Sequence, residues 1–132
     1  MNELPLVLVV EDNTDNLDLL TYQLEILNFD CICAQEGMQA LYLAKTQEPD
    51  VILLDIMLPD MDGAEVISDL RQNPKTATIP IIALTAMAMI KDKERILKAG
   101  ADDYITKPYD LEILDVAIRS HFKVKSSTLS WE

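Results

Sequence analysis

The sequence predicts an α/β fold in which a five-stranded parallel sheet carries helices on both faces. Two observations predict it. Short apolar runs alternate five times with segments of helical periodicity, and such alternation is typical of parallel strands joined by helical crossovers. The apolar runs are also nearly uninterrupted, most clearly at Val51–Leu54, as expected of strands that are buried on both faces.

The first strand is expected over Leu4–Val10, where a proline is tolerated only near the beginning. Asn13 or Thr14 can cap the following helix, which Asn28 ends. The apolar face of this helix consists of leucines at helical spacing: Leu17, Leu20, Leu24 and Leu27. Phe29–Ala34 then predicts the second strand.

The second helix is expected to begin after the turn Glu36-Gly37 and to end before Pro49. Four of its residues are candidates for the inner face: Met38, Ala40, Leu41 and Ala44. The third strand, Val51–Leu54, leads through a loop into a helix over Ala64–Gln72. The residues of that helix expected to point inward are Val66, Ile67 and Leu70.

The fourth strand is expected over Ile79–Leu84, and the next helix over Ile90–Lys98 with Gly100 as its C-terminal cap. Asp103–Thr106 predicts a short fifth strand. Asp110 can cap the last helix, whose apolar residues are Leu111, Leu114, Ala117, Ile118 and Phe122. Residues 1–122 are expected to form one domain, and Lys123–Glu132, which lacks periodicity, a tail or the start of a linker.

The chain is strongly acidic, with 23 aspartates and glutamates against 11 lysines and arginines and a formal charge of −12. This balance argues against nucleic-acid binding by the domain. It fits a protein that collects a divalent cation or meets a basic partner surface, and most of the surface acids are expected simply to keep the protein soluble. The sequence contains no apolar run of the roughly 18 residues that a membrane span needs, and no secretory signal. We therefore expect a soluble, cytoplasmic protein.

Three residues are of types that can bind a metal or undergo redox chemistry, but we expect simpler roles for them. Cys31 and Cys33 are two residues apart on a predicted strand, so their side chains would share one face, and they are expected to be buried thiols. His121 lies far along the chain from the acidic residues and is expected to be a solvated helix residue.

Polar residues follow four of the predicted strands. The first strand ends at Glu11 and Asp12, the third at Asp55, the fourth at Thr85 and the fifth at Lys107. In open parallel sheets, ligands bind at the carboxyl ends of the strands. These five side chains are therefore expected to converge on one site.

The chemistry of this set predicts a phosphoryl site. Crowded carboxylates repel one another, and a hard cation such as Mg²⁺ relieves the repulsion while keeping water or phosphate oxygens as further ligands. Lys107 can pair with Asp55 or with a bound anion, and Thr85 offers a hydroxyl donor. Asp55 would be the nucleophile, because a carboxylate can form an acyl phosphate.

Four motifs at the strand ends are together very specific: Val9-Val10-Glu11-Asp12-Asn13, Leu53 to Gly63, Ala83-Leu84-Thr85-Ala86 and Gly100 to Pro108. Through them the sequence resembles the receiver domains of two-component response regulators, over about Leu6 to His121. The resemblance implies a chemotaxis-regulator-like, flavodoxin-like sheet with strand order 2-1-3-4-5. It also implies a phosphorylation-dependent signalling switch rather than an enzyme, apart from self-phosphorylation and autodephosphorylation.

The resemblance also implies a role for each site residue. Asp55 would accept a phosphoryl group from a phosphohistidine on a partner histidine kinase or phosphotransfer protein. Mg²⁺ would be held by Glu11, Asp12, Asp55 and the backbone carbonyl of Met57. Thr85 and Lys107 would contact the phosphoryl group, and the Lys107-Pro108 peptide bond would be cis.

Tyr104 matches the switch aromatic of the family. Movement of Thr85 toward a phosphoryl oxygen would let this ring move inward and change the surface formed by the fourth helix, the fifth strand and the fifth helix. The expected binding partner of that surface is a downstream protein, an effector domain outside these residues, or a second copy of the chain.

Two alternative functions belong to other classes. One is a Mg²⁺-dependent phosphohydrolase with an aspartate nucleophile; dehalogenase-type enzymes commonly carry a second aspartate two residues after the nucleophile, where this chain has Met57. The other is an interaction module that works without phosphorylation. The intact set of site residues argues against it, and a failure to bind Mg²⁺ would support it.

Overall fold

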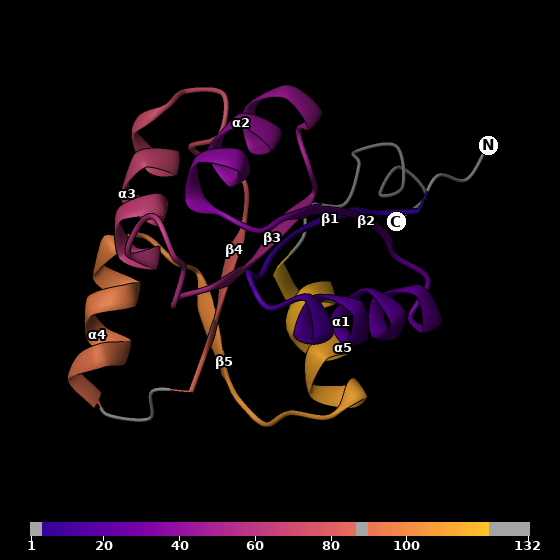
Figure 1. Cartoon of the computed structure of the whole chain (residues 1–132). Helices are drawn as coiled ribbons and strands as arrows, with labels where there is room; N and C mark the ends of the chain where they lie inside the picture. The colour runs from indigo at the N-terminus through magenta and orange to yellow at the C-terminus, as the bar shows by residue number, and fades with distance from the viewer. Residues whose placement is uncertain (1–3, 87–89, 122–132) are drawn as a thin grey trace, which may run out of the picture.

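The computed structural model describes residues 4–86 and 90–121, and within them five strands alternate with five helices (Figure 1). The elements are β1 Leu6–Val10, α1 Thr14–Ile26, β2 Asp30–Ala34, α2 Gly37–Gln47, β3 Val51–Asp55, α3 Gly63–Gln72, β4 Ile81–Thr85, α4 Ile90–Ala99, β5 Asp103–Thr106 and α5 Leu111–His121. All neighbouring strands pair in parallel, in the order β2-β1-β3-β4-β5. The predicted flavodoxin-like α/β fold is therefore confirmed.

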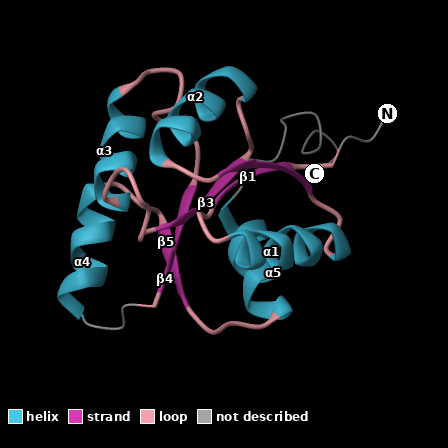
Figure 2. Cartoon of the chain, in the orientation of Figure 1, coloured by secondary structure: helices cyan, strands magenta, loops and turns pink. Residues whose placement is uncertain are grey.

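The sheet separates two layers of helices. Helices α1 and α5 lie on one face, and α2, α3 and α4 lie on the other (Figure 2). Consecutive strand residues point to opposite faces, so Val9 and Leu53 pack in the cluster with α1 and α5, whereas Val10 and Leu54 pack in the other. The central strands are consequently buried at every position, which explains their uninterrupted apolar sequence.

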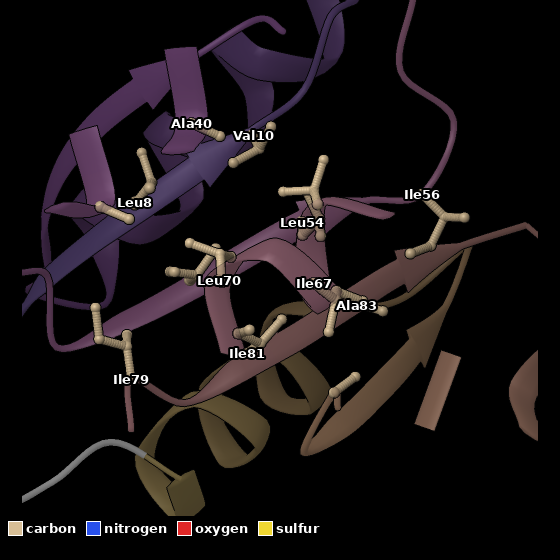
Figure 3. Close-up of a cluster of buried hydrophobic side chains, with 14 of the residues drawn as sticks. Leu8, Val10, Ala40, Leu54, Ile56, Ile67, Leu70, Ile79, Ile81 and Ala83 are labelled. Atoms are coloured by element: carbon tan, nitrogen blue, oxygen red, sulfur yellow. The ribbon is translucent and has the colours of Figure 1, made fainter. Parts of the chain in front are cut away.

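The core beneath α2, α3 and α4 is built from aliphatic side chains of the central strands and from the inner faces of those helices (Figure 3). Val66, Ile67 and Leu70 of α3 are buried as expected. Met38, however, was expected on the inner face of α2 and is instead 62% exposed. The buried residues of α2 are Gly37, Ala40 and Ala44, and the 100° turn per residue places Met38 outside this stripe.

Several predicted helix ends are confirmed. The side chain of Asn13 accepts a hydrogen bond of 2.9 Å from the Asn16 amide, and that of Asp110 accepts one of 2.9 Å from the Ile113 amide. Asn28 and Gly100 follow their helices with positive φ angles of 68° and 124°. No described helix is long and apolar enough to cross a bilayer.

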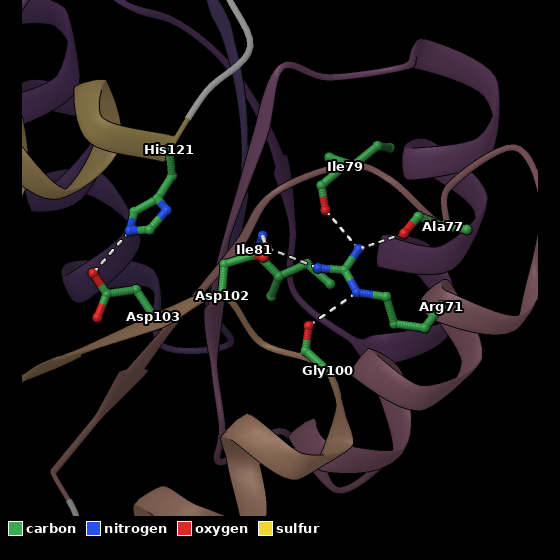
Figure 4. Close-up of polar contacts among 8 residues, drawn as sticks. All are labelled: Arg71, Ala77, Ile79, Ile81, Gly100, Asp102, Asp103 and His121. Atoms are coloured by element: carbon green, nitrogen blue, oxygen red, sulfur yellow. Dashed lines mark hydrogen bonds and ion pairs between the residues drawn. The ribbon is translucent and has the colours of Figure 1, made fainter.

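Polar contacts of Arg71 join four segments at the amino end of β4 (Figure 4). The guanidinium donates to the carbonyls of Ala77, Ile79 and Gly100 at 3.0, 2.7 and 2.9 Å, and it contacts Asp102 at 2.8 Å. The same Asp102 oxygen accepts the Ile81 amide at 2.8 Å. Because the partners lie in the α3–β4 loop and in the α4–β5 loop, and Asp102 also binds the first residue of β4, Arg71 fixes these segments relative to one another.

Two expectations outside the core need correction. His121 was expected to be solvated, but its Nε2 lies 3.0 Å from Oδ2 of Asp103, since the end of α5 packs beside the start of β5 (Figure 4). Cys31 and Cys33 are free and half-buried rather than buried, because β2 is an edge strand. Burial, with a smaller contribution from Cys33, raises the pKa of Cys31 to about 11. Phe122 and the tail Lys123–Glu132 lie outside the described residues.

Candidate functional site

The register of the two central strands brings Glu11 and Asp55 together. Val10 of β1 pairs with Leu54 of β3, so the residues that follow them, Glu11 and Asp55, lie side by side at the carboxyl ends of these strands. These ends lie at the point where the strand order reverses, between β1 and β3. Both carboxyl groups are buried, with residue exposures of 2% for Glu11 and 6% for Asp55.

Lys107 reaches this pair from the end of β5. Its backbone amide donates 2.9 Å to the carbonyl of Thr85, and its peptide bond to Pro108 is cis. Its ammonium nitrogen lies 2.8 Å from Oδ2 of Asp55 and 3.4 Å from Oε1 of Glu11. One ammonium group therefore contacts both buried carboxylates.

Backbone amides hold the other carboxylate oxygens. Oδ1 of Asp55 accepts a hydrogen bond of 2.8 Å from the amide of Met57, and Oε2 of Glu11 accepts one of 3.2 Å from the amide of Asn13. These contacts fix the orientation of each carboxyl group relative to the loop that follows it.

The electrostatics of the site favour an additional cation. Burial raises the pKa of the Glu11 carboxyl above its ordinary value, and the hydrogen bond and negative charge of Asp55 raise it further, against the opposing effects of the Asn13 amide and Lys107. Burial alone would lower the pKa of Lys107, but the neighbouring carboxyl groups of Asp55 and Glu11 outweigh it and raise that pKa. Two buried carboxyl groups thus share one ammonium.

The other predicted site residues differ in their burial and contacts. Asp12 is exposed in the β1–α1 loop, and Met57 is exposed in the β3–α3 loop. Thr85 is buried at the end of β4, where it pairs with Thr106. Tyr104 is half-buried on β5, and the ammonium group of Lys93 in α4 lies 4.7 Å from its ring centre.

The chemistry of the donor set fits Mg²⁺. Within the described residues, no three histidine, cysteine, aspartate or glutamate side chains are arranged to hold a metal ion by themselves. Mg²⁺ does not need such a cage, because it commonly uses one or two carboxylates and keeps water for its other positions. Glu11 and Asp55 supply adjacent carboxylate oxygens whose mutual repulsion a divalent cation would relieve.

Two further residues with notable contacts were not singled out from the sequence. Tyr109 is half-buried, and together with Glu11, Lys107, Pro108 and residues of α1 it lines a cavity of about 230 Å³. Its burial raises the pKa of its phenol. The second is Asp60, whose carboxylate accepts backbone amides at the start of α2. Neither stands out in the sequence, because both contacts depend on tertiary structure.

The fold and the site define a doubly wound α/β domain with an acidic centre and one lysine at the carboxyl ends of its strands. Comparison with known proteins gives this class a name. The response regulator receiver domain family matches residues 7–119, and the chain belongs to this family. Receiver domains are the phosphorylation-switch modules of two-component signalling and partner with histidine kinases.

Curated relatives include both long and short regulators. The chain is 39% identical over 117 residues to the DNA-binding dual master transcriptional regulator RpaA of Synechocystis, with 89% of this chain and 48% of RpaA covered. It is 42% identical over 114 residues to the alkaline phosphatase synthesis regulator PhoP of Bacillus subtilis, covering 86% and 47%. The chain thus spans about half the length of these two relatives.

The polar-differentiation response regulator DivK of Brucella ovis is 39% identical over 115 residues, with 87% of this chain and 94% of DivK covered. Among solved structures, the receiver domain of the sensor histidine kinase PA1611 from Pseudomonas aeruginosa superposes with a TM-score of 0.85 at 34% identity. The match covers 90% and 98% of the two chains, and that structure has a magnesium ion coordinated in its active-site cleft. CheY4 of Vibrio cholerae gives a TM-score of 0.85 at 25% identity, covering 91% and 100%.

Proposed function

We propose that this domain is switched by phosphorylation of Asp55, with the phosphoryl group supplied by a phosphohistidine on a partner histidine kinase or phosphotransfer protein. The observation that carries the proposal is the geometry of Asp55. Its carboxylate is buried at the carboxyl end of β3 and lies 2.8 Å from the ammonium group of Lys107. A nucleophile beside a fixed cation suits a reaction in which negative charge develops on phosphoryl oxygens.

The proposed transfer forms one bond and breaks one bond. A carboxylate oxygen of Asp55 bonds to phosphorus while the phosphorus–nitrogen bond breaks, and the released electron pair goes to the imidazole nitrogen of the donor. The ammonium group of Lys107 contacts the Asp55 carboxylate. After transfer it can contact a phosphoryl oxygen instead, because that oxygen is attached to the same carboxylate. The hydroxyl of Thr85, at the end of the neighbouring strand, is the proposed second contact.

The residues proposed to hold Mg²⁺ are Glu11, Asp12, Asp55 and the backbone carbonyl of Met57. When bound, the ion would supply positive charge in addition to that of Lys107 and so stabilise the transferring group. The magnesium ion in the active-site cleft of the PA1611 receiver domain supports Mg²⁺ as the ion.

The proposed output is a change in the surface formed by α4, β5 and α5. In α4 a single residue, Ile96, is fully buried among those described, and Lys93 of the same helix contacts the ring of Tyr104. A helix with so small a buried face can shift at low energetic cost. The binding partner of this surface would be a downstream protein, a second copy of the chain, or an effector domain outside this sequence.

The test is the intact mass of the protein after incubation with Mg²⁺ and acetyl phosphate, beside the Asp55→Asn variant. The proposal expects one phosphoryl adduct that requires Mg²⁺, is labile to base, and is absent from the folded variant. A stable adduct on Asp55→Asn would contradict the assignment of the nucleophile. Folded protein that takes up neither phosphoryl group nor Mg²⁺ would instead indicate an interaction module, and steady turnover of a small phosphoester would indicate a phosphohydrolase.

A further inference from the structure

Helix α2 is capped by a residue from another part of the chain. Its own N-cap residue, Glu36, makes no side-chain capping hydrogen bond. The carboxylate of Asp60, in the β3–α3 loop, takes this role instead: Oδ1 accepts the Gly37 amide at 2.7 Å and Oδ2 accepts the Met38 amide at 3.1 Å. The first amides of a helix lack partners within the helix, so this carboxylate satisfies two of them.

The contact between the loop and the helix is close. A Cβ atom added to Gly37 would lie 2.8 Å from Sδ of Met61 and 2.9 Å from Cγ2 of Val66, so a side chain at position 37 would require these neighbouring side chains to shift. The backbone amides of α2, that of Gly37 foremost, lower the pKa of Asp60, and its charge is therefore retained over the neutral range.

The loop held in this way is the one that follows the proposed nucleophile. The Met57 amide donates to Asp55 at its beginning, and the Gly63 amide donates 3.0 Å to the carbonyl of Ile56 at its end. Met57 and Asp62 also form an isolated antiparallel bridge. Asp60 lies between these two anchored ends and ties the middle of the loop to α2.

The start of α2 is linked in turn to the loop that carries the acid pair. The side-chain amide of Gln35, just before α2, donates 3.4 Å to the carbonyl of Asp12. The Glu11 amide donates 3.0 Å to the carbonyl of Ala34. Asp60 therefore connects the segment containing Met57 with the segment containing Glu11 and Asp12, although it lies outside the proposed metal ligands.

We infer that Asp60 is a positioning residue for the phosphoryl-accepting site: by capping α2 it holds the β3–α3 loop, and with it Met57, in register with Glu11 and Asp12. This inference rests on the proposed function of Asp55. It assigns Asp60 no contact with the metal ion or the phosphoryl group. Its effect is to fix the relative placement of two loops that would share one cation.

Three variants test the inference. Asp60→Ala removes both acceptors, and Asp60→Asn keeps one oxygen acceptor of similar capping strength. Asp50→Ala is the matched control, because Asp50 also accepts a long-range backbone amide, that of Leu6 at 2.7 Å, but at the amino ends of β1 and β3, away from the site. Each variant is measured for Mg²⁺ affinity by calorimetry, for the rate of phosphorylation by acetyl phosphate, and for amide hydrogen exchange without Mg²⁺.

We expect Asp60→Ala to weaken Mg²⁺ binding roughly tenfold and to slow phosphorylation. It should also speed exchange at the amides of Met57 and Gly63. Asp60→Asn should stay within about threefold of the wild type in Mg²⁺ affinity, because one capping hydrogen bond survives. Asp50→Ala should stay within about twofold, since it leaves both loops in place.

Unchanged exchange at Met57 and Gly63 in Asp60→Ala would overturn the inference, and so would an equal loss of Mg²⁺ affinity in Asp50→Ala. The proposed function can fail separately. If the wild-type protein takes up neither Mg²⁺ nor a phosphoryl group, Asp55 is not the acceptor. Faster exchange at the two loop amides in Asp60→Ala would then still support the positional role of Asp60.

Discussion

The ammonium group of Lys107 lies 2.8 Å from the carboxylate of Asp55, although 52 residues separate them in the chain. The same group reaches Glu11 at 3.4 Å. Lys107 therefore has two opposing effects on the site. It neutralises part of the buried negative charge, and it competes with any cation that the two carboxylates would bind.

Replacing Lys107 by alanine should strengthen Mg²⁺ binding in the unphosphorylated protein. Removal of one positive charge beside Asp55 should tighten the affinity roughly fivefold. The variant should remain folded, and its phosphorylation should no longer change the surface of α4, β5 and α5, because the phosphoryl oxygens lose their lysine partner. Calorimetry gives the affinity, and hydrogen exchange with and without acetyl phosphate reports the surface.

Lys45→Ala is a suitable control for the Lys107 experiment, because it removes the same charge from the exposed end of α2. Its Mg²⁺ affinity should match that of the wild type. Weaker Mg²⁺ binding in Lys107→Ala than in this control would contradict the competition argument. A wild-type surface change on phosphorylation would contradict the proposed role of Lys107 in the switch.

Glu11→Gln should stabilise the protein in buffer without divalent cations. The pKa of Glu11 is raised in the folded state, mainly by burial, so the folded protein disfavours its ionised form. The wild type therefore loses stability relative to the variant as pH rises from the pKa of Glu11 in the unfolded state to its higher pKa in the folded state. The variant should melt roughly 2–6 °C higher near pH 7, and the difference should shrink toward zero near pH 4.

Thermal melting at several pH values tests the prediction for Glu11. Addition of Mg²⁺ should reverse the order at neutral pH, because the variant loses a proposed ligand. A difference in melting temperature that stays constant between pH 4 and pH 7 would show that ionisation of Glu11 is not its source.

Arg71→Met should destabilise the fold more than any surface arginine substitution. The arginine donates to three backbone carbonyls and pairs with Asp102, and methionine of similar length would leave these acceptors without their donor. We expect a loss of about 3 kcal/mol in the free energy of unfolding, measured by urea denaturation. Mg²⁺ affinity per folded molecule should be unchanged, because the network lies at the amino end of β4.

Arg95→Met provides the comparison for Arg71. Arg95 is exposed and pairs with Asp62 at 3.1 Å, a type of surface ion pair that contributes about 0–1 kcal/mol. Equal losses of stability in the two variants would show that the carbonyl contacts of Arg71 add little to the fold.

The sequence was sufficient to predict what depends on local pattern. The uninterrupted run at Val51–Leu54 located a strand buried on both faces, and the alternation of strands with helices predicted a parallel sheet. The strand order within the sheet, β2-β1-β3-β4-β5, followed instead from the resemblance to receiver domains. Strand ends were less predictable. β4 begins at Ile81 rather than Ile79 and includes Thr85, because hydrogen bonds to neighbouring strands decide where pairing starts and stops.

Long-range contacts could not be predicted from local pattern. The predicted inner face of α2 wrongly included Met38, whereas the buried residue is its neighbour Gly37. A residue as small as Gly37 carries a weak hydrophobic signal, so the periodicity did not reveal it. The pairing of His121 with Asp103 depends on where α5 ends relative to β5. Asp60 is separated from the amides that it caps by 22 and 23 residues, so no capping motif in the sequence contains both partners.

Gly63→Ala should disturb the loop behind Asp55 more than Gly37→Ala does. A Cβ atom at Gly63 would lie 2.6 Å from Cα and 2.9 Å from the carbonyl oxygen of Ile56, which is buried and follows Asp55 directly, so backbone would have to move. At Gly37 the nearest atoms belong to side chains, Sδ of Met61 at 2.8 Å and Cγ2 of the buried Val66 at 2.9 Å, so the clash there is with side chains rather than backbone. We expect losses of about 2–3 kcal/mol for Gly63→Ala and about 1 kcal/mol for Gly37→Ala in urea denaturation. Gly63→Ala should also weaken Mg²⁺ binding. Equal losses of stability in the two variants would show that the backbone at Ile56 shifts as easily as the side chains beside Gly37.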